Sequence, residues 1–324
     1  MSRPALASAR AILAILLAAC SALALAYPTK PVRIIVPSAP GGGYDYIGRL
    51  LADRLSRQLG QAFVVENRTG AGTLVGTQAA LQPPIDGHTL LVGGLANMAF
   101  NAGLYSNPGY DPVNDFTPIA LVSSNSYALV ARRDLPLSTL REVVDFARAN
   151  PGKLTIATAG TGTGQHIAAA LLKQLTRTDI LEVPFKGAQP ALTEVLAGRV
   201  DLFFDNAAAV RPMIESGRVK VIATSGATRD AVLPKVPTSR ESGVEELVLE
   251  AWIGLFAPAK TPPAVVEQLR SAAAKVMQAP EFRQRLQSDG YRVLSMPAKE
   301  AAAFVQAEAR KWLQVIRQAG IRAE

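Results

Sequence analysis

The sequence predicts an α/β protein made of two domains. Short apolar, often β-branched runs alternate with helical patterns about 10–15 residues long, an order typical of parallel sheets covered by helices. A strand pattern, a glycine-rich loop and a helix pattern follow one another twice, in separate halves of the chain and about 120 residues apart. The length of 324 residues and the hydrophobic content of 49% allow a large core and suit two domains better than one.

Residues 1–26 have the pattern of a secretory signal. Arg3 and Arg10 precede an apolar run over residues 11–19, and an Ala-Leu-Ala cleavage site comes just before Tyr27. We therefore expect residues 1–26 to be removed as a signal peptide on export. No later segment approaches the ~18 uninterrupted apolar residues that a membrane helix needs.

Cys20 opens an alternative for this signal. The run Leu-Ala-Ala-Cys over residues 17–20 also resembles a lipoprotein cleavage box, which would leave Cys20 lipidated at the mature N-terminus. The apolar residues 22–26 would make a poor tether after it, so we favour cleavage after Ala26. The mature chain then has no cysteine and forms no disulfide.

The charge of the mature chain is mildly basic. Removal of the signal leaves 32 of the 34 Lys and Arg residues against 26 acidic residues, a net charge of +6. The basic residues are scattered, without runs and with little aromatic interleaving, so we expect no nucleic-acid partner. Such a positive field would still steer small anions towards the protein.

The first glycine-rich loop covers residues 37–45 and joins a strand pattern at 32–36 to a helix pattern that stops at Gly60. Three consecutive glycines leave main-chain amides uncovered, and the free N–H groups of the helix start add partial positive charge. The loop is a candidate anion-binding site, although a sharp turn without a ligand explains the same residues. The candidate residues are Gly41, Gly42, Gly43, Tyr44 and Asp45. Asp45 is also the expected N-cap of the helix.

Nucleotide-binding motifs do not fit this loop. Tyr46 stands where the dinucleotide pattern requires a glycine. Gly48 is followed by Arg49 and Leu50, where a phosphate-binding loop requires Lys and then Ser or Thr. We therefore expect neither NAD nor ATP, and no other cofactor.

The second glycine-rich loop covers residues 159–164, between a strand pattern at 154–158 and a helix pattern that starts at Gln165. Its threonine hydroxyls can donate to a carboxylate without adding charge. Two such loops in separate halves suggest one ligand held between two domains. The candidate residues are Gly160, Thr161, Gly162, Thr163 and His166. His166 either donates to an anion or orients the loop through a local hydrogen bond.

Two further polar residues follow predicted strands. Asn97 comes just after the strand pattern at 89–94, where ligands of open α/β sheets are usually met. Asp205 follows the apolar run at 202–204 and is expected either to contact a ligand or to cap the next helix. Separate strands are expected at 119–122 and 127–131.

No catalytic or metal-binding residue is predicted. A Gly-x-Ser-x-Gly elbow is absent, and two histidines without a mature cysteine cannot build a common zinc site. His88 belongs to a turn, where we expect it at the surface.

With these residues in view, the chain resembles the substrate-binding receptors of tripartite tricarboxylate transporters, the Bug family of extracytoplasmic solute receptors. The likeness covers nearly the whole chain after residue 26. It is carried by Tyr27-Pro28, Lys30-Pro31 with residues 32–36, Pro40-Gly41-Gly42-Gly43 with Asp45, residues 65–68 with Gly70-Ala71-Gly72, residues 86–90, Tyr110-Asp111-Pro112 with Asp115-Phe116, residues 159–163 with His166, residues 183–187, Phe204-Asp205-Asn206 and residues 252–258.

The resemblance implies a type II periplasmic-binding-protein fold, a flytrap of two α/β domains joined by two crossover strands. The partners it implies are a small organic acid and the membrane permease subunits of a tripartite transporter, and we expect a monomer in the periplasm. The acid would be held by the first loop, residues 41–45, and by the second, residues 160–163, with ordered waters assisting. Since the C-terminal helices follow the strong apolar strand at Trp252, we expect domain 1 over 27–125 and 251–324 and domain 2 over 126–250.

The chain departs from the family pattern at Tyr44 and Met98, where bulky residues would narrow the cleft or stack on a ring. The ligand therefore cannot be inherited from a relative. Two alternatives remain: a secreted α/β enzyme acting on a small acid, and an effector-type sensory domain. The absence of a catalytic elbow disfavours the enzyme. The secretory signal and the missing helix-turn-helix segment disfavour the sensory domain.

Overall fold

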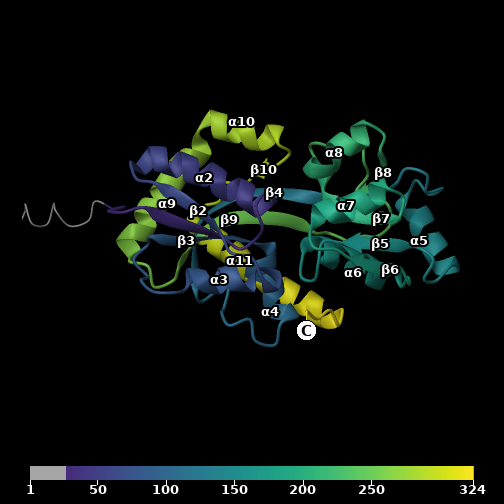
Figure 1. Cartoon of the computed structure of the whole chain (residues 1–324), viewed down its shortest axis with the longest axis horizontal. Coiled ribbons are helices and arrows are strands. Elements are labelled where there is room, and N and C mark those ends of the chain that lie inside the picture. Colours follow the sequence, from purple (N-terminus) through teal and green to yellow (C-terminus); the bar gives the residue numbers. More distant parts are fainter. Residues whose placement is uncertain (1–26, 324) are drawn as a thin grey trace, which may run out of the picture.

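The computed structural model of the protein describes residues 27–323. The expected signal peptide, its cleavage site and Cys20 lie outside the described residues. The described chain forms two lobes that are connected by long strands (Figure 1).

The strands form one network with two parts that share β4. The order is β2-β1-β3-β9-β4 in the first part and β4-β7-β5-β6 in the second, and β10 and β8 also pair with β4. The pairs of β1 with β2 and β3 are parallel, as are those of β5 with β6 and β7, whereas β4 pairs only antiparallel. The strands are β1 (Val32–Val36), β2 (Phe63–Asn67), β3 (Thr89–Gly94), β4 (Phe116–Arg132), β5 (Thr155–Thr158), β6 (Leu181–Pro184), β7 (Leu202–Asn206), β8 (Val219–Thr224), β9 (Glu250–Pro258) and β10 (Arg292–Val293).

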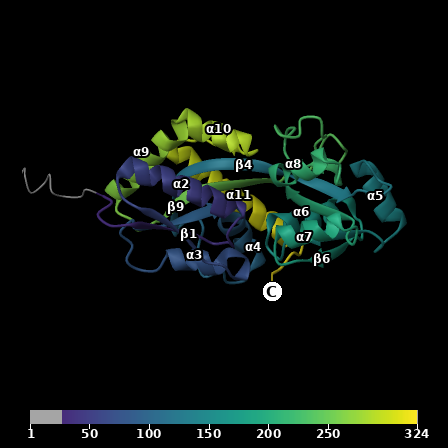
Figure 2. The same ribbon diagram turned by 45° about the horizontal axis from the view of Figure 1, so that its top comes forward.

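Strand β4 runs from one lobe into the other (Figures 1 and 2). The prediction of two separate strands at 119–122 and 127–131 is therefore wrong, because the structure has a single strand of 17 residues there. Two of the polar residues between them have side chains that are bonded within the fold. Ser124 Oγ accepts from Arg292 Nε at 2.9 Å, and Ser126 Oγ donates to Asp230 Oδ2 at 2.6 Å.

Helices cover both faces of each part of the sheet, which confirms the α/β class. On the first part, α2 and α9 pack on one face and α3 and α11 on the other; on the second part, α7 and α8 lie opposite α6. The helices are α2 (Gly43–Leu59), α3 (Leu74–Ala80), α4 (Asn101–Leu104), α5 (Leu140–Ala149), α6 (Gly164–Thr176), α7 (Ala188–Leu196), α8 (Ala207–Glu215), α9 (Pro263–Gln278), α10 (Pro280–Ser288) and α11 (Ala298–Gln318), with short turns η1 (Ala71–Thr73) and η2 (Ala96–Phe100).

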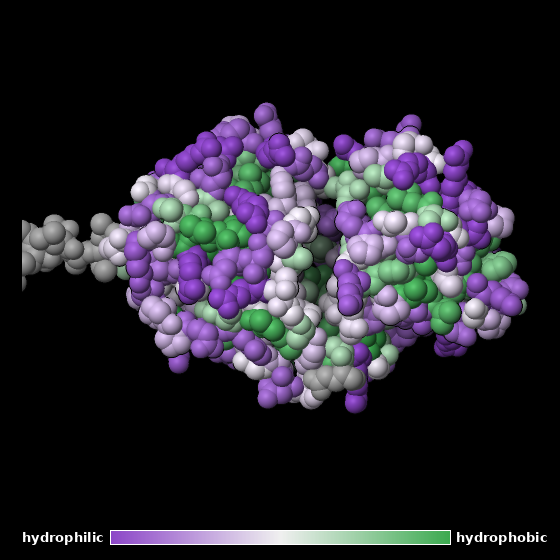
Figure 3. Space-filling model, in the orientation of Figure 1, coloured by the Kyte–Doolittle hydropathy of each residue, from purple (hydrophilic) through white to green (hydrophobic). Residues whose placement is uncertain are grey.

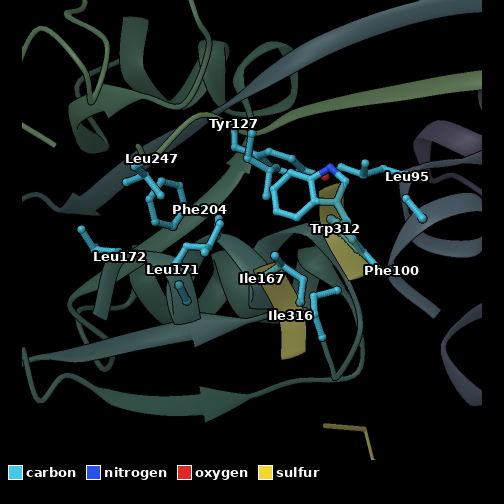
Figure 4. Packing of buried hydrophobic residues seen from close by; sticks show 14 of the residues in the cluster. Leu95, Phe100, Tyr127, Ile167, Leu171, Leu172, Phe204, Leu247, Trp312 and Ile316 are labelled. Atoms are coloured by element: carbon cyan, nitrogen blue, oxygen red, sulfur yellow. The ribbon is translucent and has the colours of Figure 1, made fainter. Parts of the chain in front are cut away.

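One hydrophobic cluster extends across both lobes. Trp312 of α11 packs edge-on against Phe100 with ring centroids 5.0 Å apart. Tyr127 and Ile167 from the second lobe belong to the same cluster, as Figure 4 shows. Helix α11, near the end of the chain, thus packs against β4 and belongs to the cluster that the two lobes share.

Candidate functional site

The first glycine-rich loop connects β1 to α2 at the edge of the cleft between the lobes. Helix α2 begins at Gly43, and its N-cap Gly42 supplies no side-chain bond. The first-turn amides of Gly43 and Tyr44 have no partner within the helix and remain available to a ligand. Gly41 has a φ of +86°, a backbone conformation that glycine adopts without steric cost.

Asp45 holds this loop instead of capping its helix. The expectation that Asp45 is the N-cap is wrong, because Gly42 occupies that position and Asp45 lies in the first turn. Its carboxylate is 4% exposed and accepts from the Gly41 amide at 3.0 Å and from Arg49 Nε at 2.9 Å. Asn67 Nδ2 of β2 donates to its other oxygen at 2.9 Å.

The pKa of Asp45 reflects these contacts. Burial acts to raise it, but the hydrogen bonds from Arg49, the Gly41 amide and Asn67 outweigh burial and keep the pKa below its ordinary value. Asp45 is therefore ionised, and its carboxylate is occupied by the hydrogen bond from the loop amide of Gly41 and the ion pair with Arg49.

Tyr44 and Asn97 lie together at the end of β3 and share hydrogen bonds there. The Tyr44 hydroxyl accepts from the Ala96 amide at 3.2 Å and lies 3.5 Å from Asn97 Oδ1. Asn97 is fully buried; its oxygen accepts from the Gly94 amide at 2.9 Å and its amide donates to Thr77 Oγ1 at 3.1 Å. In this arrangement Asn97 positions Tyr44 and the end of β3.

Tyr44 and Met98, the two bulky residues that depart from the family pattern, lie in different surroundings. Tyr44 is partly buried at the start of α2, beside the cleft. Met98 is fully buried in the core cluster and packs towards Gly93. Of the two, only Tyr44 lies where it can narrow the cleft.

The second glycine-rich loop connects β5 to α6, and Thr163 is the N-cap of that helix. Its hydroxyl donates to the Gly160 carbonyl at 2.7 Å and accepts from the His166 amide at 3.3 Å. The one hydroxyl proton of Thr163 is thus already used. Thr161 is exposed, and its hydroxyl has no hydrogen bond within residues 27–323.

His166 orients the second loop. Its Nδ1 accepts from the Gly162 amide at 3.3 Å, while Nε2 lies 3.5 Å from Glu182 Oε2. Burial lowers the pKa of His166, although Glu182 acts in the opposite direction. A neutral ring is what the Gly162 bond requires, since a protonated Nδ1 cannot accept. The sequence left two roles open for His166, donation to an anion and orientation of the loop. The bond with the Gly162 amide corresponds to the second role.

Asp205 lies at the end of β7 and is 2% exposed. The expected capping role is not found, because Asn206 is the N-cap of α8 and no side chain caps that helix. Asp205 Oδ1 accepts from the Asn206 amide at 2.8 Å and from Gln165 Nε2 at 3.2 Å. Burial raises the pKa of Asp205 to about 6, against the effect of these two bonds.

Sequence reasoning missed two tyrosines of this cleft. The Tyr127 hydroxyl of β4 lies against the start of α6, so close that a Cβ on Gly164 would fall 1.9 Å from it. The Tyr291 hydroxyl lies 3.4 Å from where a Cβ of Gly43 would stand. Burial raises the pKa of Tyr291 to about 12 and that of Tyr127 further, so both hydroxyls keep their protons.

The lobes touch on both sides of the furrow that Figure 3 shows between them. A Cβ on Gly162 would lie 3.2 Å from Leu104 Cδ1 of the other lobe, and one on Gly72 would lie 3.5 Å from the Thr161 carbonyl oxygen. At the opposite edge, a Cβ on Gly290 would fall 2.3 Å from Ala208 Cβ. The Tyr291 hydroxyl beside Gly43 and the Tyr127 hydroxyl beside Gly164 lie near each other, so the starts of α2 and α6 approach the same region from opposite lobes.

Residues 27–323 contain no cluster of three or more His, Cys, Asp or Glu side chains suited to a metal ion. Within the same residues, no helix is long and apolar enough to cross a membrane.

Two α/β lobes linked by long strands, each with a glycine-rich loop before a helix start, have the architecture of a solute-binding protein of the periplasmic type. The sequence model of the tripartite tricarboxylate transporter family receptor matches residues 47–321, and the chain belongs to this family. The family is described as one of transporter receptors, and BugD, a similar solved protein, is a periplasmic binding protein. The predicted family and the predicted fold are thereby confirmed.

Relatives match along most of the chain. A protein encoded in the tcbD-tcbE intergenic region of Pseudomonas sp. (strain P51) is 33% identical over 292 residues, which are 90% of this chain and 87% of the relative. The protein BugT of Bordetella pertussis is 31% identical over 297 residues, 91% of each chain.

Solved structures agree with this assignment. The periplasmic binding protein BugD is 32% identical with a TM-score of 0.82, over 91% of this chain and 100% of BugD. MatC of Rhodopseudomonas palustris, solved with bound malate, is 33% identical with a TM-score of 0.82, over 90% of this chain and all of MatC. An R. palustris protein solved with adipate is 32% identical with a TM-score of 0.84, over 91% of this chain and 99% of that protein.

Proposed function

We propose that this receptor binds a small organic carboxylate between its lobes and releases it unchanged to the permease subunits of a tripartite transporter. The observation that supports the proposal is the pair of helix starts, those of α2 and α6, each behind a glycine-rich loop and each beside a tyrosine hydroxyl, Tyr291 at Gly43 and Tyr127 at Gly164. Free amides at a helix start favour an anion through hydrogen bonds and through the helix dipole.

The neutrality of both loops suits a receptor that must release its cargo. The guanidinium of Arg49, on the helix that follows the first loop, is engaged by Asp45 at 2.9 Å and by Asn67 Oδ1 at 3.1 Å. A free guanidinium would hold a carboxylate through charge-assisted bonds roughly twice as strong as neutral ones. Adipate and malate in the related structures support a carboxylate ligand here.

We propose further that the lobes act as two domains, residues 27–125 with 251–324 and residues 126–250, which close over the ligand. The segments that join them are β4 and the start of β9, where the Leu249 amide bonds the Ser225 carbonyl at 2.9 Å. The receptor would act as a monomer in the periplasm.

The mature chain would begin at Tyr27. This side chain is 5% exposed and its hydroxyl donates to the Gly87 carbonyl at 2.7 Å, so the proposed first residue is part of the folded lobe. N-terminal mass spectrometry of the exported protein checks this proposal. A lipidated Cys20 would contradict it and place the receptor on a membrane surface.

The function is tested by thermal unfolding against a panel of mono- and dicarboxylates, amino acids, aromatic acids and nucleotides. A ligand at 100 times its Kd should stabilise the folded state by about 2.7 kcal/mol. Recovery of the ligand unchanged, followed by NMR, separates a receptor from the alternative of a secreted enzyme. Conversion of the compound would favour the enzyme, and a shift with nucleotides alone would contradict the proposal.

A further inference from the structure

The carboxyl group of Asp205 is only half used by the protein. Oδ1 accepts from the Asn206 amide and from Gln165, but Oδ2 is buried and has no hydrogen-bond partner among residues 27–323. Buried carboxylates are normally paired, because an ion that has lost its water must recover the energy from a partner. A carboxylate oxygen left in this state leaves a place for a donor from outside the chain.

The groups around Asp205 supply no positive charge. Gln165 is the second residue of α6, Tyr127 comes from β4, and Tyr291 follows α10. The charge of Asp205 contributes to the raised pKa of both tyrosines, which shows that they lie near it. No Lys or Arg is among the groups that shift the pKa of Asp205.

Asp205 also lies beside both anion-binding loops. Its partner Gln165 belongs to the first turn of α6, directly after the second loop. Tyr291 connects it to the first loop, because the Tyr291 hydroxyl stands over Gly43. A ligand whose carboxylate occupies these loops therefore has other atoms within reach of Asp205.

We propose that Asp205 Oδ2 accepts a hydrogen bond from a protonated amino group of the ligand, so that the cleft selects an acid that carries both a carboxylate and an ammonium group. This inference rests on the proposed function and narrows its ligand class. The neutral loops bind the carboxylate of the ligand. Its ammonium group forms an ion pair with Asp205, for which the protein provides no cationic partner. A second carboxylate at the same place would face Asp205 with like charge and bind less well.

The test is calorimetric titration of the mature protein with pairs of acids that differ only in the amino group. Suitable pairs are aspartate with succinate, glutamate with glutarate, and 4-aminobutyrate with butyrate. For at least one pair we expect the amino acid to bind at least about tenfold more tightly at pH 7.5. Asp205→Asn keeps an oxygen for Gln165 and Asn206 and should abolish that preference, while the deaminated partner binds more tightly than to the wild type.

The wild type gives a second readout that needs no variant. Tyr127 and Tyr291, the titratable groups facing Asp205, stay neutral between pH 5 and 7.5, and the ligand's ammonium group stays charged. The preference for the amino member should therefore shrink between pH 7.5 and 5, as Asp205 takes up a proton.

Three results would overturn the inference. The first is equal or tighter binding of the deaminated member in every pair, and the second is a preference that survives in Asp205→Asn; both leave the carboxylate receptor intact. The third is a lack of binding by both members of all pairs, which would count against the receptor function as well.

Discussion

Two acids of the cleft, Asp45 and Asp205, have opposite situations that their sequence positions do not reveal. Both stand near the junction of a strand and a helix. Asp45 receives bonds from Gly41, Arg49 and Asn67, whereas Asp205 keeps one oxygen without a partner. Ionised Asp45 therefore stabilises the folded protein, whereas ionised Asp205 lowers its free energy of unfolding.

Asp45→Ala should lower the free energy of unfolding by about 1.5–3 kcal/mol at pH 7, since it removes hydrogen bonds to a buried charge. Asp53→Ala is the matched control: Asp53 is on the same helix but pairs with Arg57 at the surface, where an ion pair contributes little. The folded-state pKa of Asp45 lies below the unfolded value, so its contribution is present above pH ~4 and is lost as the pH falls through the lower value. Equal losses for both variants in urea titrations would contradict this role.

Asp205→Asn should stabilise the protein without ligand. The pKa of Asp205 rises from 3.8 to about 6 on folding, so the folded state holds its proton more tightly and loses stability as the pH rises from about 4 to 6. Above pH 6 the variant should gain about 2–3 kcal/mol, and below pH 4 the gain should vanish. The measurement is the urea midpoint of both proteins from pH 4 to 8; a variant no more stable at pH 7.5 would contradict the unpaired charge.

At the scale of elements, the sequence predicted what local patterns control. The strand, glycine-rich loop and helix of each half lie where expected, because apolar periodicity and glycine clusters are read within about 25 residues. It failed at β4, where buried serines interrupt the pattern but are bonded to Arg292 and Asp230, more than 100 residues away. Tyr291 was missed for the same reason: it follows α10 in sequence and reaches the cleft only through tertiary packing.

The turn after α10 provides a test of lobe closure. Gly290 has a φ of +82°, and a Cβ there would fall 2.3 Å from Ala208 Cβ across the furrow. Gly290→Ala should therefore weaken ligand binding at least about tenfold by holding the lobes apart. Gly243→Ala is the control, because Gly243 has a φ of +91° and nothing within 4 Å of a Cβ. It carries the same backbone cost of about 1 kcal/mol without the clash, so equal calorimetric affinities in both variants would contradict the closure.

For the whole molecule, the α/β class and the receptor family followed from sequence, and the ligand did not. The fold is shared, at TM-scores of 0.84 and 0.82, by proteins solved with adipate and with malate. The ligand depends on the few side chains that line the cleft. The side chains that we propose to select the ligand, Tyr44, Tyr127, Asp205 and Tyr291, come from four distant parts of the chain.

The most direct test of the central claim is a crystal structure of the protein with the acid that binds most tightly in the panel. The account predicts one carboxylate in the cleft, within about 3 Å of main-chain amides at the starts of α2 and α6, with the compound unchanged. A carboxylate bound elsewhere on the protein, or held in the cleft by a guanidinium instead of these amides, would contradict it.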